Sequence, residues 1–177
     1  MQVPWGEVGA ELGKRVVDDA DKVGSQLKDE LKEILQEHDI TSTSWRYELT
    51  IWIMFWLWYL ANSPKLQNAG ATELLLDAHH RASYESMIRA GLVSPEYNAL
   101  RAWEADLEER FTKYKKVFDN RPAGPVLFTG TIGWEFCLYV YGGQKPDPRV
   151  AIIMNLRASH QFHAMVEFLQ KLESQYS

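Results

Sequence analysis

The sequence has few of the features that identify common protein classes. Its 177 residues include a single cysteine, Cys137, so no disulfide can form within the chain. We therefore expect a reducing compartment and predict a cytoplasmic protein. The first residues, MQVPWGEVGAELGKR, show no basic stretch followed by an apolar one, as a secretory signal would. P-loop, GxGxxG, GxSxG and HExxH patterns are absent as well, so the sequence points to no catalytic residue and no cofactor.

Basic residues are also in deficit, with 19 Lys and Arg against 24 Asp and Glu. The imbalance lies in residues 1–60, which hold 6 basic and 11 acidic residues, whereas residues 61–177 hold 13 of each. A basic cluster, KYKK at 113–116, is expected to face the acidic residues at 104–110 across a solvated helix surface. A nucleic-acid binder would show a basic patch instead, so we expect no nucleic-acid partner.

Long hydrophobic runs are missing too. The most apolar stretch, LTIWIMFWLWYLA at 49–61, has thirteen residues. That number covers about 20 Å of helix, whereas a membrane-spanning helix needs about 20 apolar residues. Ser63 and Pro64 follow closely, and a helix rarely continues through the residue before a proline. We therefore predict no membrane span and no membrane partner.

The same run predicts a helix at about 45–61. At about 100° per residue its apolar side chains cover every side of the helix, which is typical of a helix at the centre of a core. We therefore expect Trp52 and Trp56 to be buried. In the alternative, one side of the helix stays exposed and binds a partner protein or a second copy of the chain. Trp45 and Trp58 are the candidate aromatic anchors of such a surface.

Four other segments have apolar residues at steps of three and four, the pattern of long amphipathic helices. Gly91 is placed as a glycine that ends a helix, and Ser94-Pro95 and Asp147-Pro148 are pairs that start one. The predicted amphipathic helices span 5–39, 71–90, 95–118 and 148–175.

Residues 126–141, VLFTGTIGWEFCLYVY, allow two interpretations. Their Val, Thr, Phe, Trp and Tyr content favours strands, and a hairpin around Thr129-Gly130-Thr131 is one possibility. A lone hairpin needs a sheet to join, and the rest of the chain offers none. We prefer a second short buried helix at about 130–141. The predicted fold is a single all-α domain, 1–177, a bundle of about six helices with the two short apolar helices at its centre.

Two carboxylates fall within apolar segments. Glu48 begins the tryptophan-rich helix, and Glu135 lies in GWEFCLYVY. A buried carboxylate is costly unless it is paired or hydrogen-bonded. Arg46, Arg81 or Arg157 is the expected partner, and exposure at a helix end is the alternative.

Histidines add a second group of candidate ligands. Asp77 and His80 share one helical stripe, and His160 and His163 share another. Together with Glu48 and Glu135, these residues are similar in number to the ligands of a di-metal carboxylate bundle. Such a bundle takes Glu-x-x-His from two of its helices. Neither pair has that sequence, and the last two histidines lie opposite the core stripe of their helix. We predict no metal site; if this is wrong, the ligands are Glu48, Asp77, His80, Glu135, His160 and His163.

These observations favour a non-enzymatic protein-interaction module, although they do not exclude an enzyme. The partner is expected to be another protein, basic in charge, with a homo-oligomer as a further option. A small acidic protein that neutralises a basic partner, as an immunity protein or antitoxin does, is one form of this function. The first alternative is a di-metal helical enzyme, and the second is a small-molecule sensor with an aromatic pocket between the second and fifth helices. The candidate partner-binding residues are Asp18, Asp19, Asp21, Trp45 and Trp58.

Overall fold

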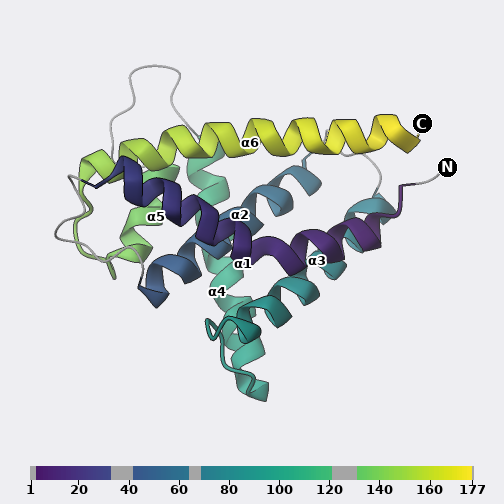
Figure 1. The fold of residues 1–177 in the computed structure, drawn as a ribbon, viewed down its shortest axis with the longest axis horizontal. Helices are drawn as coiled ribbons and strands as arrows, with labels where there is room; N and C mark the ends of the chain where they lie inside the picture. The colour runs from purple at the N-terminus through teal and green to yellow at the C-terminus, as the bar shows by residue number, and fades with distance from the viewer. Residues whose placement is uncertain (1–2, 33–41, 64–68, 121–130, 177) are drawn as a thin grey trace.

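The computed structural model describes residues 3–32, 42–63, 69–120 and 131–176. Within these ranges the chain is all-α and contains no strand, as predicted (Figure 1). The hairpin alternative is wrong for the part of 126–141 that is described, because residues 132–140 form a helix; residues 126–130 lie outside the described ranges. The helices are α1 (Trp5–Glu30), α2 (Thr43–Ala61), α3 (Ala69–Arg89), α4 (Tyr97–Asp119), α5 (Ile132–Val140) and α6 (Pro148–Tyr176).

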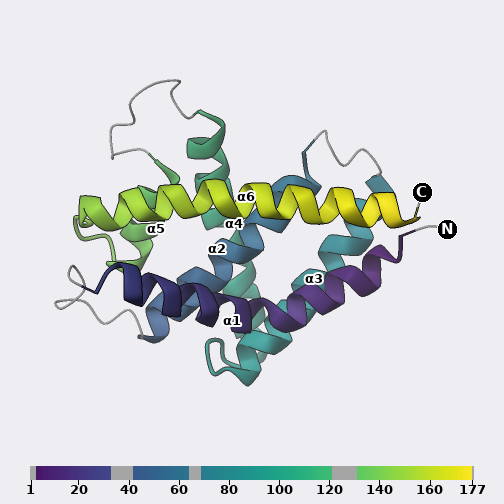
Figure 2. The same ribbon diagram turned by 45° about the horizontal axis from the view of Figure 1, so that its top comes forward.

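Helix α2 lies at the centre and contacts all five other helices. Figures 1 and 2 show α1 and α6 on one side of it and α4 on the other, with the start of α1 and the end of α6 at the same end of the molecule. Trp52 and Trp56 are 0% and 1% exposed, which confirms their predicted burial. The ring of Trp52 packs edge-on against Trp56, Tyr114 and Phe136, at centroid distances of 5.6, 5.4 and 5.1 Å. Aromatic side chains from α2, α4 and α5 thus form one core.

Side-chain caps fix where two helices begin. Ser42 Oγ accepts a hydrogen bond from the backbone N–H of Trp45, so α2 starts at Thr43, two residues before the predicted start. Thr131 Oγ1 accepts in the same way from the N–H of Trp134 at the start of α5. Asn155 of α6 joins this cap, since it accepts from the N–H of Gly133 at 2.7 Å and donates to Thr131 Oγ1 at 2.8 Å. The cap therefore also ties α5 to α6.

Two predicted helix ends were wrong. Helix α1 stops at Glu30 instead of reaching 39, and residues 31 and 32 form a turn; residues 33–41 lie outside the described ranges. Helix α4 starts at Tyr97, because Ser94 Oγ accepts from the N–H of Glu96 in a local turn and does not cap a helix. The predicted glycine end of α3 is confirmed: Gly91 has φ 69°, and the N–H of the next residue donates to the carbonyl of Met87.

Helices α1 and α3 approach each other closely because α1 presents glycines at the contact. A Cβ built on Gly9 would overlap the carbonyl oxygen of Leu75, and one on Gly13 would lie 2.5 Å from the carbonyl oxygen of His79. Ser86 Oγ donates to the carbonyl oxygen of Lys14 across the same contact, at 3.0 Å. Removing the glycines would therefore force the two backbones apart.

We expect Gly9→Ala to destabilise the fold by roughly 1–3 kcal/mol, because the added methyl group meets rigid backbone of α3. Gly6→Ala is the matched control, since a Cβ there would meet no described atom within 4 Å other than its chain neighbours and the nearby backbone of its own helix. That control should gain up to about 1 kcal/mol from helix propensity. Urea denaturation followed by circular dichroism measures both. Shifts of the same sign in the two variants would mean that α1 does not dock closely on α3.

Candidate functional site

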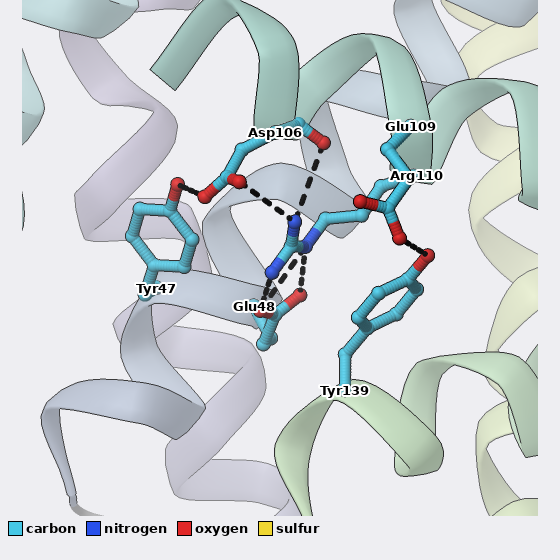
Figure 3. A network of polar contacts seen from close by, with 6 residues as sticks. All are labelled: Tyr47, Glu48, Asp106, Glu109, Arg110 and Tyr139. Carbon is cyan, nitrogen blue, oxygen red and sulfur yellow. Dashed lines mark hydrogen bonds and ion pairs between the residues drawn. The ribbon is translucent and has the colours of Figure 1, made fainter. Parts of the chain in front are cut away.

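A buried ion pair connects α2 with α4. The guanidinium of Arg110 donates to both carboxylate oxygens of Glu48, with Nε–Oε2 at 2.9 Å and Nη2–Oε1 at 2.7 Å (Figure 3). The two side chains are 12% and 5% exposed. Arg110 Nη1 also donates to the backbone carbonyl of Asp106 at 3.3 Å and lies 3.5 Å from its carboxylate. This two-point geometry fixes the guanidinium between the helices.

Two tyrosines lie on either side of the guanidinium. Tyr47 of α2 donates its hydroxyl to Asp106 Oδ2 at 2.9 Å, and Tyr139 of α5 donates to Glu109 Oε1 at 3.0 Å (Figure 3). The guanidinium carbon of Arg110 lies 4.3 Å from the centre of the Tyr139 ring and 5.8 Å from that of Tyr47. We call these residues the Glu48–Arg110 network: Tyr47, Glu48, Asp106, Glu109, Arg110 and Tyr139.

Burial and pairing shift the pKa values within the network. Burial raises the pKa of the Glu48 carboxyl, and the hydrogen bonds and charge of Arg110 limit that rise. Burial opposes the charged form of Arg110, but hydrogen bonds to Glu48 raise the pKa of the guanidinium overall. Burial and a carboxylate acceptor also raise the pKa of both Tyr47 and Tyr139. At neutral pH the tyrosines therefore keep their protons and act as hydrogen-bond donors.

The predicted partners of the buried carboxylates were wrong. Glu48 binds Arg110, which is not among the predicted partners, whereas Arg46 and Arg157 pair with carboxylates of α1. Arg81 is exposed on α3. Arg110 was missed because it lies in a charged segment, EADLEER, that is typical of a solvent-exposed helix face. Its side chain is nevertheless buried against α2.

Glu135 has a weaker partner than Glu48. Its side chain is 14% exposed, and its Oε2 lies 3.9 Å from Lys113 Nζ, beyond hydrogen-bond distance. Among the described residues that oxygen has no hydrogen-bond donor. Glu48 and Glu135 thus face basic residues of α4, and neither shares a site with a histidine.

The other candidate metal ligands are dispersed. His80 lies 3.7 Å from Glu104 of α4, and burial lowers its pKa. Asp77 is exposed on α3, and His160 and His163 are exposed on α6, as their position opposite the core stripe predicted. Within the described part of the chain, no three His, Cys, Asp or Glu residues are close enough to hold a metal ion. The di-metal alternative therefore finds no site in this region.

The predicted partner-binding residues lie in different environments. Asp18 is exposed, whereas Asp19 pairs with Lys22 of α1 at 3.0 Å. Asp21 accepts two hydrogen bonds from Arg46, at 2.8 and 2.9 Å, which hold α1 to α2.

The two candidate tryptophans, Trp45 and Trp58, differ in how far they are exposed. Trp45 is 3% exposed and packs against Phe136, so its side chain is not available at the surface. Trp58 is half-buried, with its ring 5.2 Å from that of Phe111 on α4. Trp58 alone of the two contributes to the surface near α4.

A hollow on the opposite side of α2 is lined mainly by apolar side chains. It has a volume of about 230 Å³ and lies between α1, α2 and α6. This position differs from that of the predicted aromatic pocket, which was expected between the second and fifth helices. We call it the α1/α6 groove; its apolar lining is Leu12, Val23, Ile53, Trp56, Ala164, Met165 and Phe168.

Cys137 is buried in α5, and burial raises the pKa of its thiol. A thiol in this state is a weak nucleophile. None of the described helices combines the length and apolar character that a membrane span needs. Comparison with family models, curated proteins and solved structures finds no match to this chain.

Proposed function

We propose that this chain is a non-enzymatic protein-interaction module of the cytoplasm that binds a basic segment of another protein at the Glu48–Arg110 network. The observation that carries the proposal is the net negative charge of the network, whose side chains are fixed by hydrogen bonds. The network holds three carboxylates and one guanidinium, and the neighbouring pair of Glu135 and Lys113 adds no net charge, so two negative charges remain on the α4 side of the molecule. Lysine or arginine side chains of a partner would complement that charge.

The outer groups of the network are already ordered in the free chain. Each tyrosine hydroxyl donates a hydrogen bond to a carboxylate, and the guanidinium of Arg110 lies against both tyrosine rings. A partner therefore meets side chains that lose little rotamer freedom on binding, which lowers the entropy cost of association. Tyrosine and arginine are also the residue types that dominate interface energetics.

The same geometry argues against acid–base catalysis at the network. A general acid or base works best when its pKa lies near the operating pH. The pKa values of Tyr47 and Tyr139 are raised away from that range, and Glu48 is held by a bidentate arginine. A protein that neutralises a basic enzyme, in the manner of an immunity protein or antitoxin, is one form of the proposed function.

A charge reversal at the rim tests the proposal. Glu109→Lys removes the acceptor of Tyr139 and adds a positive charge, whereas Glu85→Lys makes the same change at an exposed position on α3. Immobilised wild-type and Glu85→Lys proteins should retain the same partner from an extract of the source cell, and Glu109→Lys should lose it. Added salt should weaken the retention, because exposed charges are screened beyond about 8–10 Å.

A defined probe gives a second readout. An oligolysine peptide titrated into labelled protein should shift the amide resonances of residues around Asp106 and Glu109 before those of α1. Equal retention of every captured protein by all three immobilised forms, together with peptide shifts spread over α1, would contradict the proposal. The acidic helix α1 would then be the better candidate surface.

A further inference from the structure

We propose that the outer face of α4 is the interface of a homodimer, in which α4 packs antiparallel against α4 of a second copy of the chain. The choice of a second copy follows from the charges on this face, which complement themselves when the helix is turned end for end. The two residues that carry the argument are Glu108 and Lys116. Neither belongs to the Glu48–Arg110 network, so the inference does not rest on the proposed function.

A hollow of about 500 Å³ lies along the outer face of α4, and within the described ranges that helix alone lines it. The lining residues are three or four positions apart and therefore share one face of the helix. All of them are exposed, and α1 and α6 lie on the far side of α2 (Figures 1 and 2). The lining residues are Ala105, Glu108, Glu109, Thr112, Lys113 and Lys116.

Two charges on this face are unpaired. The side chains of Glu108 and Lys116 make no hydrogen bond or ion pair with any residue in the part of the chain that the structure describes. The other two charged residues of the hollow have neighbours, since Glu109 accepts from Tyr139 at 3.0 Å and Lys113 lies 3.9 Å from a carboxylate of α5. The unpaired charges are opposite in sign and eight positions apart, about 12 Å along the helix, so they do not meet within one chain.

Thr112 lies midway between the two unpaired charges. If two copies of α4 pack antiparallel about a twofold axis at Thr112, a residue four positions before it faces the residue four positions after it in the other copy. Glu108 then faces Lys116 of the second copy, and the symmetry repeats this contact, which gives two intermolecular ion pairs. A parallel arrangement would place each charge against its like, which is unfavourable. The charge pattern therefore selects the antiparallel pair.

The side chains on and beside the face suit a helix–helix contact. Ala105 and Thr112 are small, and the distance between packed helix axes depends on the size of the side chains at the contact. A half-buried aromatic ring lies on either side: Trp58 packs on Phe111, and Tyr139 bonds to the opposite edge of the face. Aromatic residues are enriched at interfaces. Their apolar area adds to the ion pairs, which contribute little when exposed.

Sedimentation equilibrium of the wild-type protein tests the dimer. At protein concentrations up to about 1 mM, which detect weak association, the protein should show a monomer–dimer equilibrium that added salt weakens. Glu108→Lys removes both intermolecular ion pairs at once and sets like charges against each other, so it should weaken the dimer at least about tenfold. Lys116→Glu should have the same effect. Glu85→Lys, at an exposed position on α3, is the matched control and should leave the dimer unchanged.

Mixing the two variants tests the antiparallel geometry. A chain with Glu108→Lys has two positive charges at the contact and a chain with Lys116→Glu has two negative ones, so each opposes the other's repulsion. An equimolar mixture should form a heterodimer about as tight as the wild-type dimer, although each variant alone associates weakly. A mixture that associates no better than either variant alone overturns the proposal, as does wild-type protein that stays monomeric at about 1 mM. A dimer that neither substitution weakens also overturns it, because the second copy would then bind elsewhere on the chain.

Discussion

Arg110→Met is expected to destabilise the fold by about 3–5 kcal/mol, the cost of leaving one partner of a buried ion pair without its counter-charge. Methionine keeps the apolar stem of the side chain but removes every hydrogen bond to Glu48, which is 5% exposed. It also removes one of two cations beside Tyr139, since Lys113 Nζ still lies 5.3 Å from the centre of that ring. Urea unfolding at pH 7 measures the loss.

A double variant separates the charge from the volume. Glu48→Leu combined with Arg110→Met replaces the pair by apolar side chains, and such replacements are often neutral or stabilising. We expect the double variant to be more stable than Arg110→Met alone. If the two single changes were additive, Glu48 and Arg110 would not interact in the native state.

The loss in Arg110→Met should also depend on pH. Burial raises the pKa of Glu48, and Arg110 opposes that rise, so the variant raises the pKa further. A carboxyl with a raised pKa in the folded state favours folding below that pKa, and this contribution is lost as the pH rises through it. The deficit of the variant should therefore shrink as the pH is lowered from 7 toward 5. A deficit independent of pH over that range would contradict a further rise in the pKa of Glu48 on loss of Arg110.

The sequence was sufficient to predict that α2 lies at the centre of the bundle, because its apolar composition allows no exposed position. Apolar side chains on every side of a helix can only be covered by surrounding it, and Trp52, Phe55 and Trp56 are accordingly at most 1% exposed. Local chemistry also placed the end of α3 at Gly91, since only a residue that tolerates positive φ continues the chain there. Both inferences depend on neighbours within a few residues.

The candidate site could not be predicted in the same way. Glu48 and Arg110 are 62 positions apart, and the pairing depends on how α4 is rotated against α2. The sequence around Arg110 is highly charged, so its turn toward the core has no local signal. The α1/α6 groove likewise depends on the packing of three helices, and Trp45 is buried because Phe136 of α5 covers it. Interactions between distant segments decide each of these positions.

Trp52→Ala should cost about 3–5 kcal/mol, the range for deleting a large aromatic side chain from a core. The side chain is 0% exposed and packs against three aromatic rings. Its loss also leaves Gln161 Oε1 without the donor that holds it. Trp58→Ala is the matched control on the same helix, and because Trp58 is half-buried it should cost roughly 1–2 kcal/mol.

The comparison of the two tryptophans distinguishes a core helix from an interaction surface. If Trp52 formed part of a core, its removal would lower the melting temperature of the isolated chain by several times as much as removal of Trp58. A surface built for a partner predicts the opposite, because exposed aromatic anchors contribute to binding and little to the stability of the free chain. Equal and small losses in both variants would therefore favour a partner surface on α2. The Glu48–Arg110 network would then no longer be supported by a helix fixed in the core.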